Sequence, residues 1–451
     1  MNAHDLPSTT VTVIGAARSG VAAAELLSSH GARVFVSDQQ TADRLRSSVE
    51  LLGRRGIPVE TGGHTDRVYD CSLMVISPGV PSNAPVVLGA LEKKIRVVSE
   101  LEAASWFCRC PIIAVTGSNG KTTTATLIGR ILGDAKKKHV VAGNIGTAFS
   151  SVVLGLAETD LAVLEVSSFQ LDHCETFHPS VSVILNITED HMDRYNHSME
   201  QYAASKARVF MNQSGDDVVV YSADDEWTGK TIRNARCRAL PFSLSRRFDE
   251  GAFVENETLV LAREGKRSPV ISLDEISIRG MHNAYNAMAS ALVGSMLGAS
   301  TASIRSTLRN FKGVEHRLEF VKEVNGIKYV NDSKATNVDS VWYALQAFTQ
   351  PLIVLMGGRD KGNDYSRLQE LVRKRVKAIV AIGESAEKVE QAFKEQTRVQ
   401  RAVSMDQAVR MAADLASRGD VVLLSPACAS FDWFQNYEHR GNVFKELVGK
   451  L

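Results

Sequence analysis

The chain has 451 residues, 44% of them apolar and 23% charged, and its 52 basic and 51 acidic side chains leave a net charge of +1. This balance excludes a chain-wide basic surface for nucleic acid or an anionic membrane, so we expect neither as a partner. The opening MNAHDLPSTT lacks the pattern of a secretory signal, and no apolar run reaches the roughly 18 residues of a membrane span. Six scattered cysteines suit reduced thiols in a cytoplasmic protein.

Short β-branched segments alternate with helical patterns along most of the chain, which predicts parallel sheets covered by helices. The first series predicts a helix over residues 20–29 and strands over residues 11–14, 33–37, 73–77 and 96–98. A second series starts at residue 111. Between about residues 239 and 279 its pattern becomes that of an antiparallel hairpin, and a helix opens near His282.

A third series follows Gly313, with strands at IKYVNDS, PLIVLMGG, KAIVAIGE and DVVLLSPA. Its predicted helices cover residues 338–348, 366–376, 386–396 and 405–417. The length suits about three domains. We therefore predict an α/β protein with a Rossmann-like domain at residues 1–106, a central P-loop ATPase-like domain with a parallel and a small antiparallel sheet at 107–312, and a doubly wound α/β domain at 313–451.

The first predicted strand leads into VTVIGAARSG (residues 11–20), and Asp38 follows the second strand. The pattern is similar to a dinucleotide fingerprint, but Ala17 replaces the glycine that lets the backbone approach a pyrophosphate. An NAD-dependent oxidoreductase and a Rossmann-like domain without a ligand both stay open as alternatives.

The strongest motif is TGSNGKTTT (residues 116–124), between an apolar strand and a helical pattern. Backbone N–H groups at a helix N-terminus favour a polyphosphate, Lys121 adds positive charge, and the hydroxyl of Thr122 can hold Mg²⁺. The general pattern has glycine where this chain has Val115, so the loop is a compact variant. A P-loop GTPase fits poorly, because the sequence has no N-K-x-D motif for guanine.

Three further side chains in the second series are candidates. Glu165 ends the strand LAVLE and His191 follows LNITEDH, where a carboxylate and an imidazole at adjacent strand ends suit Mg²⁺ bound to ATP. Glu165 could instead be the acid of a helix N-terminus, and residues 190–193 a solvated loop. Lys206 lies two turns into a helix opened by a capping box at Ser198, where an ordinary surface lysine is the alternative.

In the third series, Asp332, Lys334 and Thr336 follow the first strand, Lys361 follows another and Ser430 follows the last. All five therefore lie at carboxyl ends of parallel strands, the binding edge of such sheets. For the lysines, the alternative is solvated surface.

Several blocks resemble the Mur ligase family, which also includes folylpolyglutamate synthetases. The match starts at TGSNGKT and continues at GNIG (143–146), EVSSFQL (165–171), NITEDHMD (186–193), NDSKATN (331–337) and SPACASFD (425–432). These blocks resemble the branch that adds D-glutamate to UDP-N-acetylmuramoyl-L-alanine. The resemblance implies a monomeric ligase of peptidoglycan synthesis that uses ATP and forms an acyl phosphate. A folylpolyglutamate synthetase-like ligase is the alternative within the family.

The resemblance also implies which residues form the site. The implied catalytic residues are Lys121, Glu165, His191 and Lys206. Two Mg²⁺ ions would be held by Thr122, Glu165, His191 and Lys206, the last as a carbamate formed with CO₂. ATP would contact Gly117, Ser118, Asn119, Gly120, Lys121, Thr122, Thr123, Asn283, Asn286, Arg317 and Asp332. The UDP substrate would contact Ala17, Arg18, Ser19, Asp38, Gln39, Ser77, Gly79 and Asn144. D-glutamate would contact Lys334, Thr336, Lys361, Ser430 and Tyr437.

Overall fold

The structure is a computed structural model that describes residues 6–278, 280–360 and 362–451. Lys361, a predicted site residue, lies outside the described residues. The chain divides into two compact units. The first comprises Met1–Ile187, Arg194–Ile276 and Ala284–Phe311, and the second comprises Thr188–Asp193, Ser277–Asn283 and Lys312–Leu451.

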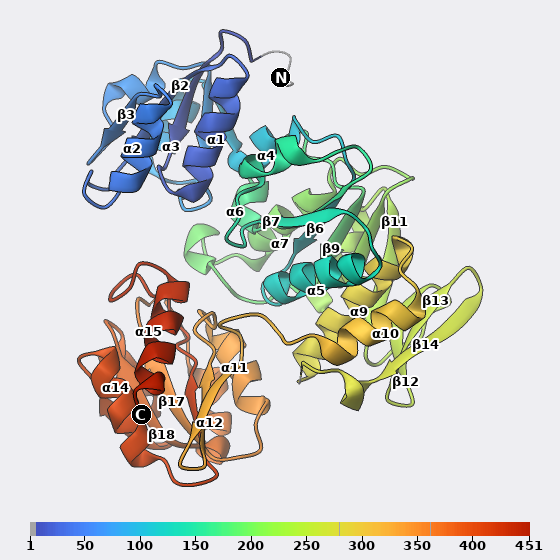
Figure 1. Ribbon diagram of the computed structural model, residues 1–451, viewed down its shortest axis with the longest axis vertical. Helices are drawn as coiled ribbons and strands as arrows, with labels where there is room; N and C mark the ends of the chain where they lie inside the picture. The colour runs from blue at the N-terminus through green and yellow to red at the C-terminus, as the bar shows by residue number, and fades with distance from the viewer. Residues whose placement is uncertain (1–5, 279, 361) are drawn as a thin grey trace. The chain divides into compact units, whose positions relative to one another are not determined.

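The amino-terminal sheet of the first unit, drawn in blue in Figure 1, is parallel and has the strand order β3-β2-β1-β4-β5. Its strands are β1 (Thr10–Ile14), β2 (Arg33–Asp38), β3 (Val59–Thr61), β4 (Leu73–Ile76) and β5 (Arg96–Ser99). The helices are α1 (Arg18–Ser29), α2 (Arg46–Arg54), α3 (Pro85–Glu92), α4 (Glu100–Ser105) and the 3₁₀ turn η2 (Asp66–Tyr69). Alternate strand residues enter two cores: Val11 and Val13 pack with α1, α2 and α4, whereas Met74 and Ile76 pack with α3.

The second sheet of this unit has the order β14-β13-β12-β11-β10-β9-β6-β8-β7. It is parallel from β7 to β12 and antiparallel from β12 to β14, so the predicted hairpin is part of a three-stranded meander. The strands are β6 (Ile112–Thr116), β7 (His139–Gly143), β8 (Leu161–Glu165), β9 (Val181–Ile184), β10 (Val218–Ser222), β11 (Arg238–Ser243), β12 (Gly251–Glu255), β13 (Thr258–Arg263) and β14 (Lys266–Ser272).

The helices of this part are α5 (Lys121–Asp134), α6 (Ser168–Leu171), α7 (Met199–Ala207), α8 (Glu226–Thr231), α9 (Met281–Met296) and α10 (Thr301–Asn310). Its 3₁₀ turns are η3 (Phe149–Ser151), η4 (Val153–Gly155), η5 (Met192–Arg194), η6 (Arg208–Phe210), η7 (Ile232–Asn234) and η8 (Leu273–Glu275). Helix α7 starts where the sequence predicts, because the Ser198 side chain accepts a hydrogen bond from the backbone of Gln201.

A buried carboxylate of α4 joins the two sheets of the first unit. Glu102 accepts hydrogen bonds from the indole of Trp106 (3.0 Å) and the Thr176 hydroxyl (2.5 Å). It also accepts three consecutive backbone N–H groups, those of Glu175, Thr176 and Phe177, at 2.8 to 3.1 Å. Since a buried carboxyl group needs such donors to replace its lost hydration, the contact fixes α4 on the segment after α6.

A second carboxylate of α4 repeats the connection. Glu100 accepts the backbone N–H and the hydroxyl of Ser150, at 2.8 and 2.5 Å. Burial raises the pKa of Glu100, against the hydrogen bonds from Ser150 that lower it. The two sheets of the first unit are therefore joined by buried polar contacts of both carboxyl groups.

The sheet of the second unit has the order β15-β16-β20-β17-β18-β19 and is parallel except for the pair β15–β16. Its strands are β15 (Glu319–Val324), β16 (Ile327–Asn331), β17 (Leu352–Gly357), β18 (Val376–Ile382), β19 (Arg398–Arg401) and β20 (Val421–Leu424). Its helices are α11 (Val338–Gln346), η9 (Ser366–Leu368), α12 (Gln369–Arg375), α13 (Ala386–Phe393), α14 (Met405–Leu415) and α15 (Tyr437–Gly449). Helices α11 to α13 share one core and α14 and α15 the other, as in a doubly wound fold.

The predicted fold class is confirmed: the sheets are largely parallel, with a small antiparallel portion. Strands β3, β15 and β19 were not predicted, because VET, EFVKEV and RVQR are short or polar. The domain boundaries near residues 106 and 312 stay predictions. Among the described helices, none has the length and apolar character needed to cross a membrane.

Candidate active site

The loop between β6 and α5 has the geometry of an anion site. Gly117 and Gly120 both have positive φ, +147° and +88°, and Gly120 is the N-cap of the 14-residue α5. A Cβ on Gly120 would lie 2.3 Å from the Asn286 side chain, so glycine alone fits there without strain. The N-terminus of a helix is a general binding site for anions, so this end of α5 suits phosphate oxygens.

Asn186 holds this loop in place. Its side chain accepts the N–H of Asn119 at 2.8 Å and donates to the carbonyl of Asn119 at 3.1 Å, while its own carbonyl accepts the N–H of Ser118 at 2.9 Å. No role was predicted for Asn186, although it opens the NITEDHMD block two residues after the end of β9. The paired amide contacts fix the loop before any ligand arrives.

Two lysine amines converge on one carbonyl of the loop. Lys121 Nζ donates to the carbonyls of Gly117 (2.7 Å) and Ser118 (2.8 Å), and Lys206 Nζ donates to that of Gly117 at 3.0 Å. Lys206 is 1% exposed and lies 4.4 Å from the centre of the Tyr202 ring. The alternative of an exposed surface lysine is therefore wrong, and positive charge is concentrated beside the loop.

Thr122 and Glu165 form the pair that the sequence predicts for Mg²⁺. The Thr122 hydroxyl donates to the Glu165 carboxylate at 2.6 Å, and each residue is 2% exposed. Among the described residues no group of three or more His, Cys, Asp or Glu could hold a metal. A hydroxyl and a single carboxylate fit Mg²⁺, which is usually bound by one or two carboxylates plus substrate phosphates. Glu165 is not the acid of a helix N-terminus, because Ser167 and Gln170 form the capping box of α6.

His191 belongs to the second compact unit. It has a positive φ of +54°, and its backbone N–H donates to Asp190 at 3.0 Å. Asn337 donates to the other oxygen of Asp190, also at 3.0 Å. That His191 and Glu165 hold the same metal stays a prediction.

The four other predicted ATP contacts are divided between the units. In the first, Asn286 accepts the hydroxyl of Thr124 at 3.2 Å, beside the phosphate loop. Asn283, Arg317 and Asp332 belong to the second. Arg317 Nε is buried without a hydrogen-bond partner in the described structure. Because an unsatisfied buried donor is costly, this atom favours an anionic ligand there.

Asp332 is a buried carboxyl group whose side chain accepts few hydrogen bonds. It accepts the N–H of Leu318 at 3.2 Å and the hydroxyl of Ser425 at 2.9 Å. Burial raises its pKa to about 7, against the opposing effects of Ser425 and Arg317. A cation beside this carboxyl would therefore favour its ionised form.

A cavity of about 680 Å³ lies at the carboxyl edge of the amino-terminal sheet. All the residues predicted to contact the UDP substrate line it: Ala17, Arg18, Ser19, Asp38, Gln39, Ser77, Gly79 and Asn144. The N-terminus of the 12-residue α1 lines the same cavity. The structure thus brings these residues together, and their role in binding stays a prediction.

Two side chains give this cavity its shape. Asp38 accepts the N–H groups of Ala16 (2.6 Å) and Gln40 (2.7 Å), and so ties the loop after β1 to the end of β2. Asn144 donates its backbone N–H to the carbonyl of Glu165 at 2.9 Å and its amide to Ser167 at 2.8 Å. Asn144 therefore connects the cavity to the Thr122–Glu165 pair.

In the second unit, β16, β20 and β17 are neighbours, so the loops carrying Lys334, Thr336 and Ser430 share one edge. Lys334 Nζ donates to the Tyr437 hydroxyl at 3.1 Å, which joins two predicted D-glutamate contacts. Ser430 is buried, whereas Lys334 and Thr336 are partly exposed. Lys361, the fifth predicted contact, is not described.

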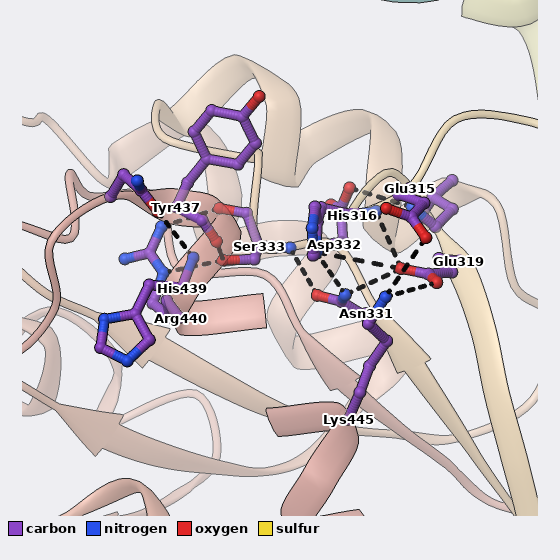
Figure 2. A network of polar contacts seen from close by, with 12 residues as sticks. Glu315, His316, Glu319, Asn331, Asp332, Ser333, Tyr437, His439, Arg440 and Lys445 are labelled. Carbon is purple, nitrogen blue, oxygen red and sulfur yellow. Dashed lines mark hydrogen bonds and ion pairs between the residues drawn. The ribbon is translucent and has the colours of Figure 1, made fainter. Parts of the chain in front are cut away.

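Arg440, which the sequence analysis missed, holds this edge together (Figure 2). Its guanidinium donates to the hydroxyl and the carbonyl of Ser333 at 3.0 and 2.7 Å. It also donates to the carbonyls of Cys428 (3.1 Å) and Ala429 (3.3 Å). The side chain is 1% exposed, and burial lowers its pKa to about 10. One arginine thus fixes the loops after β16 and β20.

A neighbouring network fixes the end of β16. The Asn331 amide donates to Glu319 at 2.9 Å and to His316 Nδ1 at 2.8 Å, and Lys445 donates to Glu319 at 3.0 Å. Figure 2 shows these side chains together, with Glu315 also beside Lys445. The backbone that presents Asp332 and Lys334 is therefore held by polar contacts on both sides.

Three family models match the chain in order. They describe a MurD N-terminal domain (residues 11–86), a Mur ligase middle domain (115–294) and a Mur ligase, glutamate ligase domain (316–428). A UDP-N-acetylmuramoylalanine--D-glutamate ligase from Chloroherpeton thalassium is 45% identical, over 100% of both chains. The one from Salinibacter ruber is 46% identical, again over 100% of both.

Solved structures share the fold at low identity. The UDP-N-acetylmuramate-alanine ligase MurC from Thermotoga maritima is 18% identical, with a TM-score of 0.62 over 98% of this chain and 99% of its own. MurF ligase from Thermotoga maritima in complex with ADP is 16% identical, with a TM-score of 0.61 over 100% of this chain and 97% of its own.

Arg440→Leu should destabilise the second unit by about 3 kcal/mol, because four buried acceptor contacts lose a charged donor. Calorimetry of the full chain should show a lower melting temperature. Arg373→Leu is the matched control, since that arginine is exposed on α12 and should change stability by less than about 0.5 kcal/mol. Equal effects of the two variants would contradict the role assigned to Arg440.

Proposed function

This chain belongs to the family of UDP-N-acetylmuramoylalanine–D-glutamate ligases, and we propose that it adds D-glutamate to UDP-N-acetylmuramoyl-L-alanine with ATP, in peptidoglycan synthesis. The main support for this function is a contact of Asn144. This residue lines the cavity, and its backbone N–H donates a hydrogen bond to the carbonyl of Glu165. Folylpolyglutamate synthesis and NAD-dependent oxidation are set aside, because full-length relatives are D-glutamate ligases.

The reaction needs ATP because a carboxylate and an ammonium do not condense at neutral pH. Transfer of the γ-phosphoryl group to the L-alanine carboxylate makes an acyl phosphate with a good leaving group. The unprotonated amine of D-glutamate attacks its carbonyl carbon. A C–N bond then forms, the C–O bond to phosphate breaks, and phosphate and a proton are released.

The phosphate loop supplies the charge stabilisation that this transfer requires. Backbone N–H groups of α5 and the ammonium of Lys121 would hold the β- and γ-phosphates of ATP, as preorganised donors. Thr122 and Glu165 would hold Mg²⁺, which when bound neutralises charge on the transferring phosphoryl group. Asn186 keeps the loop fixed, so little reorganisation is needed during transfer.

We place the UDP group in the amino-terminal cavity, with its diphosphate at the N-terminus of α1. The loops of Lys334, Thr336 and Ser430 would take D-glutamate, whose two carboxylates suit an ammonium and hydroxyls. Arg440 would position that site indirectly, because it holds the backbone of the loops after β16 and β20.

We also propose that a second Mg²⁺ is held by a carbamate on Lys206. The support is a buried amine 3.0 Å from the carbonyl of Gly117, close to the loop that would hold the triphosphate. The ammonium first loses one proton, and the neutral amine then reacts with CO₂, which forms an N–C bond and releases a second proton. A cation is thereby converted into an anionic ligand for the metal.

Lys206→Ala should be inactive and partly restored by a short added carboxylate, whereas Lys206→Arg should stay inactive, because guanidinium neither reacts with CO₂ nor binds Mg²⁺. Carbon-13 NMR with labelled CO₂ should show a carbamate signal that Lys206→Ala abolishes. Lys230→Ala, at an exposed lysine of α8, is the control and should keep both activity and signal. A carbamate signal that survives in Lys206→Ala would contradict the assignment.

Phosphate release tests the function itself. With ATP, Mg²⁺ and UDP-N-acetylmuramoyl-L-alanine, D-glutamate should support turnover, while L-glutamate and D-alanine should be at least about 100-fold poorer, since polar groups built for a substrate are left unpaired by its analogues. Equal turnover with all three amino acids would refute the proposed specificity.

A further inference from the structure

His64 lines the amino-terminal cavity together with the residues predicted to contact the UDP substrate. It follows β3, whose residue Glu60 pairs in register with Ser37 of β2. The Ser37 hydroxyl lies 2.6 Å from Glu60 Oε1 and 2.6 Å from His64 Nδ1. Glu60, Ser37 and His64 therefore form a chain of hydrogen bonds that ends at the cavity.

Glu60 is the ionised end of this chain. Burial acts to raise the pKa of Glu60, but hydrogen bonds from Ser37 and Thr65 outweigh burial and lower it. Thr65 donates its hydroxyl to Glu60 Oε2 at 2.7 Å and its backbone N–H to Oε1 at 3.2 Å. The carboxylate can therefore only accept hydrogen bonds.

The direction of each hydrogen bond follows from this. Ser37 has one hydroxyl proton, and it must go to Glu60, which has none to give. The Ser37 oxygen is then an acceptor for His64, so Nδ1 of His64 carries the proton. Burial lowers the pKa of His64, against the effects of Glu60 and Asp38, which keeps the imidazole neutral at neutral pH. Its Nε2 is therefore unprotonated and accepts hydrogen bonds.

We propose that His64 is a specificity residue of the cavity, and that its Nε2 accepts a hydrogen bond from an N–H or O–H group of the substrate's nucleoside. This inference rests on the proposed function, which puts a uridine diphosphate in the cavity. The N-terminus of α1 attracts the diphosphate, so the nucleoside extends toward the end of β2, where Asp38 and His64 lie.

The acceptor gives a chemical basis for discrimination. Each carboxylate oxygen of Asp38 already accepts a hydrogen bond from a backbone N–H group. His64 adds a further hydrogen-bond acceptor for a ligand at the same end of the cavity. Uracil offers the imide N3–H and ribose offers hydroxyls. A nucleoside without the donor would leave Nε2 desolvated and unpaired, which costs affinity.

Calorimetric titration of the full chain with UDP tests the proposal. His64→Leu should weaken UDP about tenfold, while His64→Gln, whose amide oxygen can replace Nε2, should stay within about threefold. The wild type should bind one of two analogues about tenfold more weakly than UDP. Weaker binding of 3-methyluridine diphosphate identifies the imide N–H as the donor, and weaker binding of 2′-deoxyuridine diphosphate identifies the ribose hydroxyl. The His64→Leu variant should bind UDP and the analogue that is weaker in the wild type with equal affinity. His30→Gln, at the other end of α1, is the control and should match the wild type.

The tautomer is measured independently of binding. Nitrogen-15 NMR of labelled histidines, with the His64 signal identified from His64→Gln, should show Nδ1 protonated and Nε2 bare. Ser37→Ala should shift this population toward the Nε2–H form. An Nε2–H tautomer in the wild type, or unchanged UDP affinity in His64→Leu, would overturn this inference alone. Failure of the wild type to bind UDP would overturn the proposed occupant of the cavity as well.

Discussion

The carboxylate of Glu102 accepts five hydrogen bonds inside the first unit, and the relation between the cavity and the phosphate loop depends on it. Without those donors the buried carboxyl group would be left without hydrogen-bond partners, which is costly. Glu100 adds a second contact from the same short helix. As a result, a cavity on one sheet and a phosphate loop on another belong to one body, and Asn144 joins them.

The same rule, that buried polar groups need partners, explains the reactive centre. Asn186 satisfies the loop backbone, and Lys121 and Lys206 share the carbonyl of Gly117. In the second unit Arg440 donates hydrogen bonds to carbonyls of the loops after β16 and β20. The phosphate loop and the loop that carries Lys334 are thus held by Asn186 and Arg440, and fixed loops of this kind let a preorganised site keep its geometry.

The sequence predicted most of the fold, and it proposed many residues of the candidate site, because both follow local patterns. Strand periodicity located most of the parallel strands. The glycine-rich loop located α5 with Thr122, and the end of the apolar strand LAVLE located Glu165. Residues that act through tertiary contacts carried no such signal. Arg440 looks like any helix arginine, and His64 gains its role only when β2 and β3 align Ser37 with Glu60. The edge strand β19 (RVQR) was missed for a similar reason. Its composition does not favour a strand, and it becomes one because it pairs with β18. The burial of Lys206 likewise depends on what α7 packs against.

The central claim is that the phosphate loop transfers a phosphoryl group to the L-alanine carboxylate. Oxygen-18 in that carboxylate tests it most directly, because the oxygen that leaves with phosphate comes from the substrate. After turnover with ATP and D-glutamate, mass spectrometry of the released inorganic phosphate should show one oxygen-18 atom per molecule. Label in AMP, or phosphate without label, would contradict transfer through an acyl phosphate and with it the role assigned to the loop.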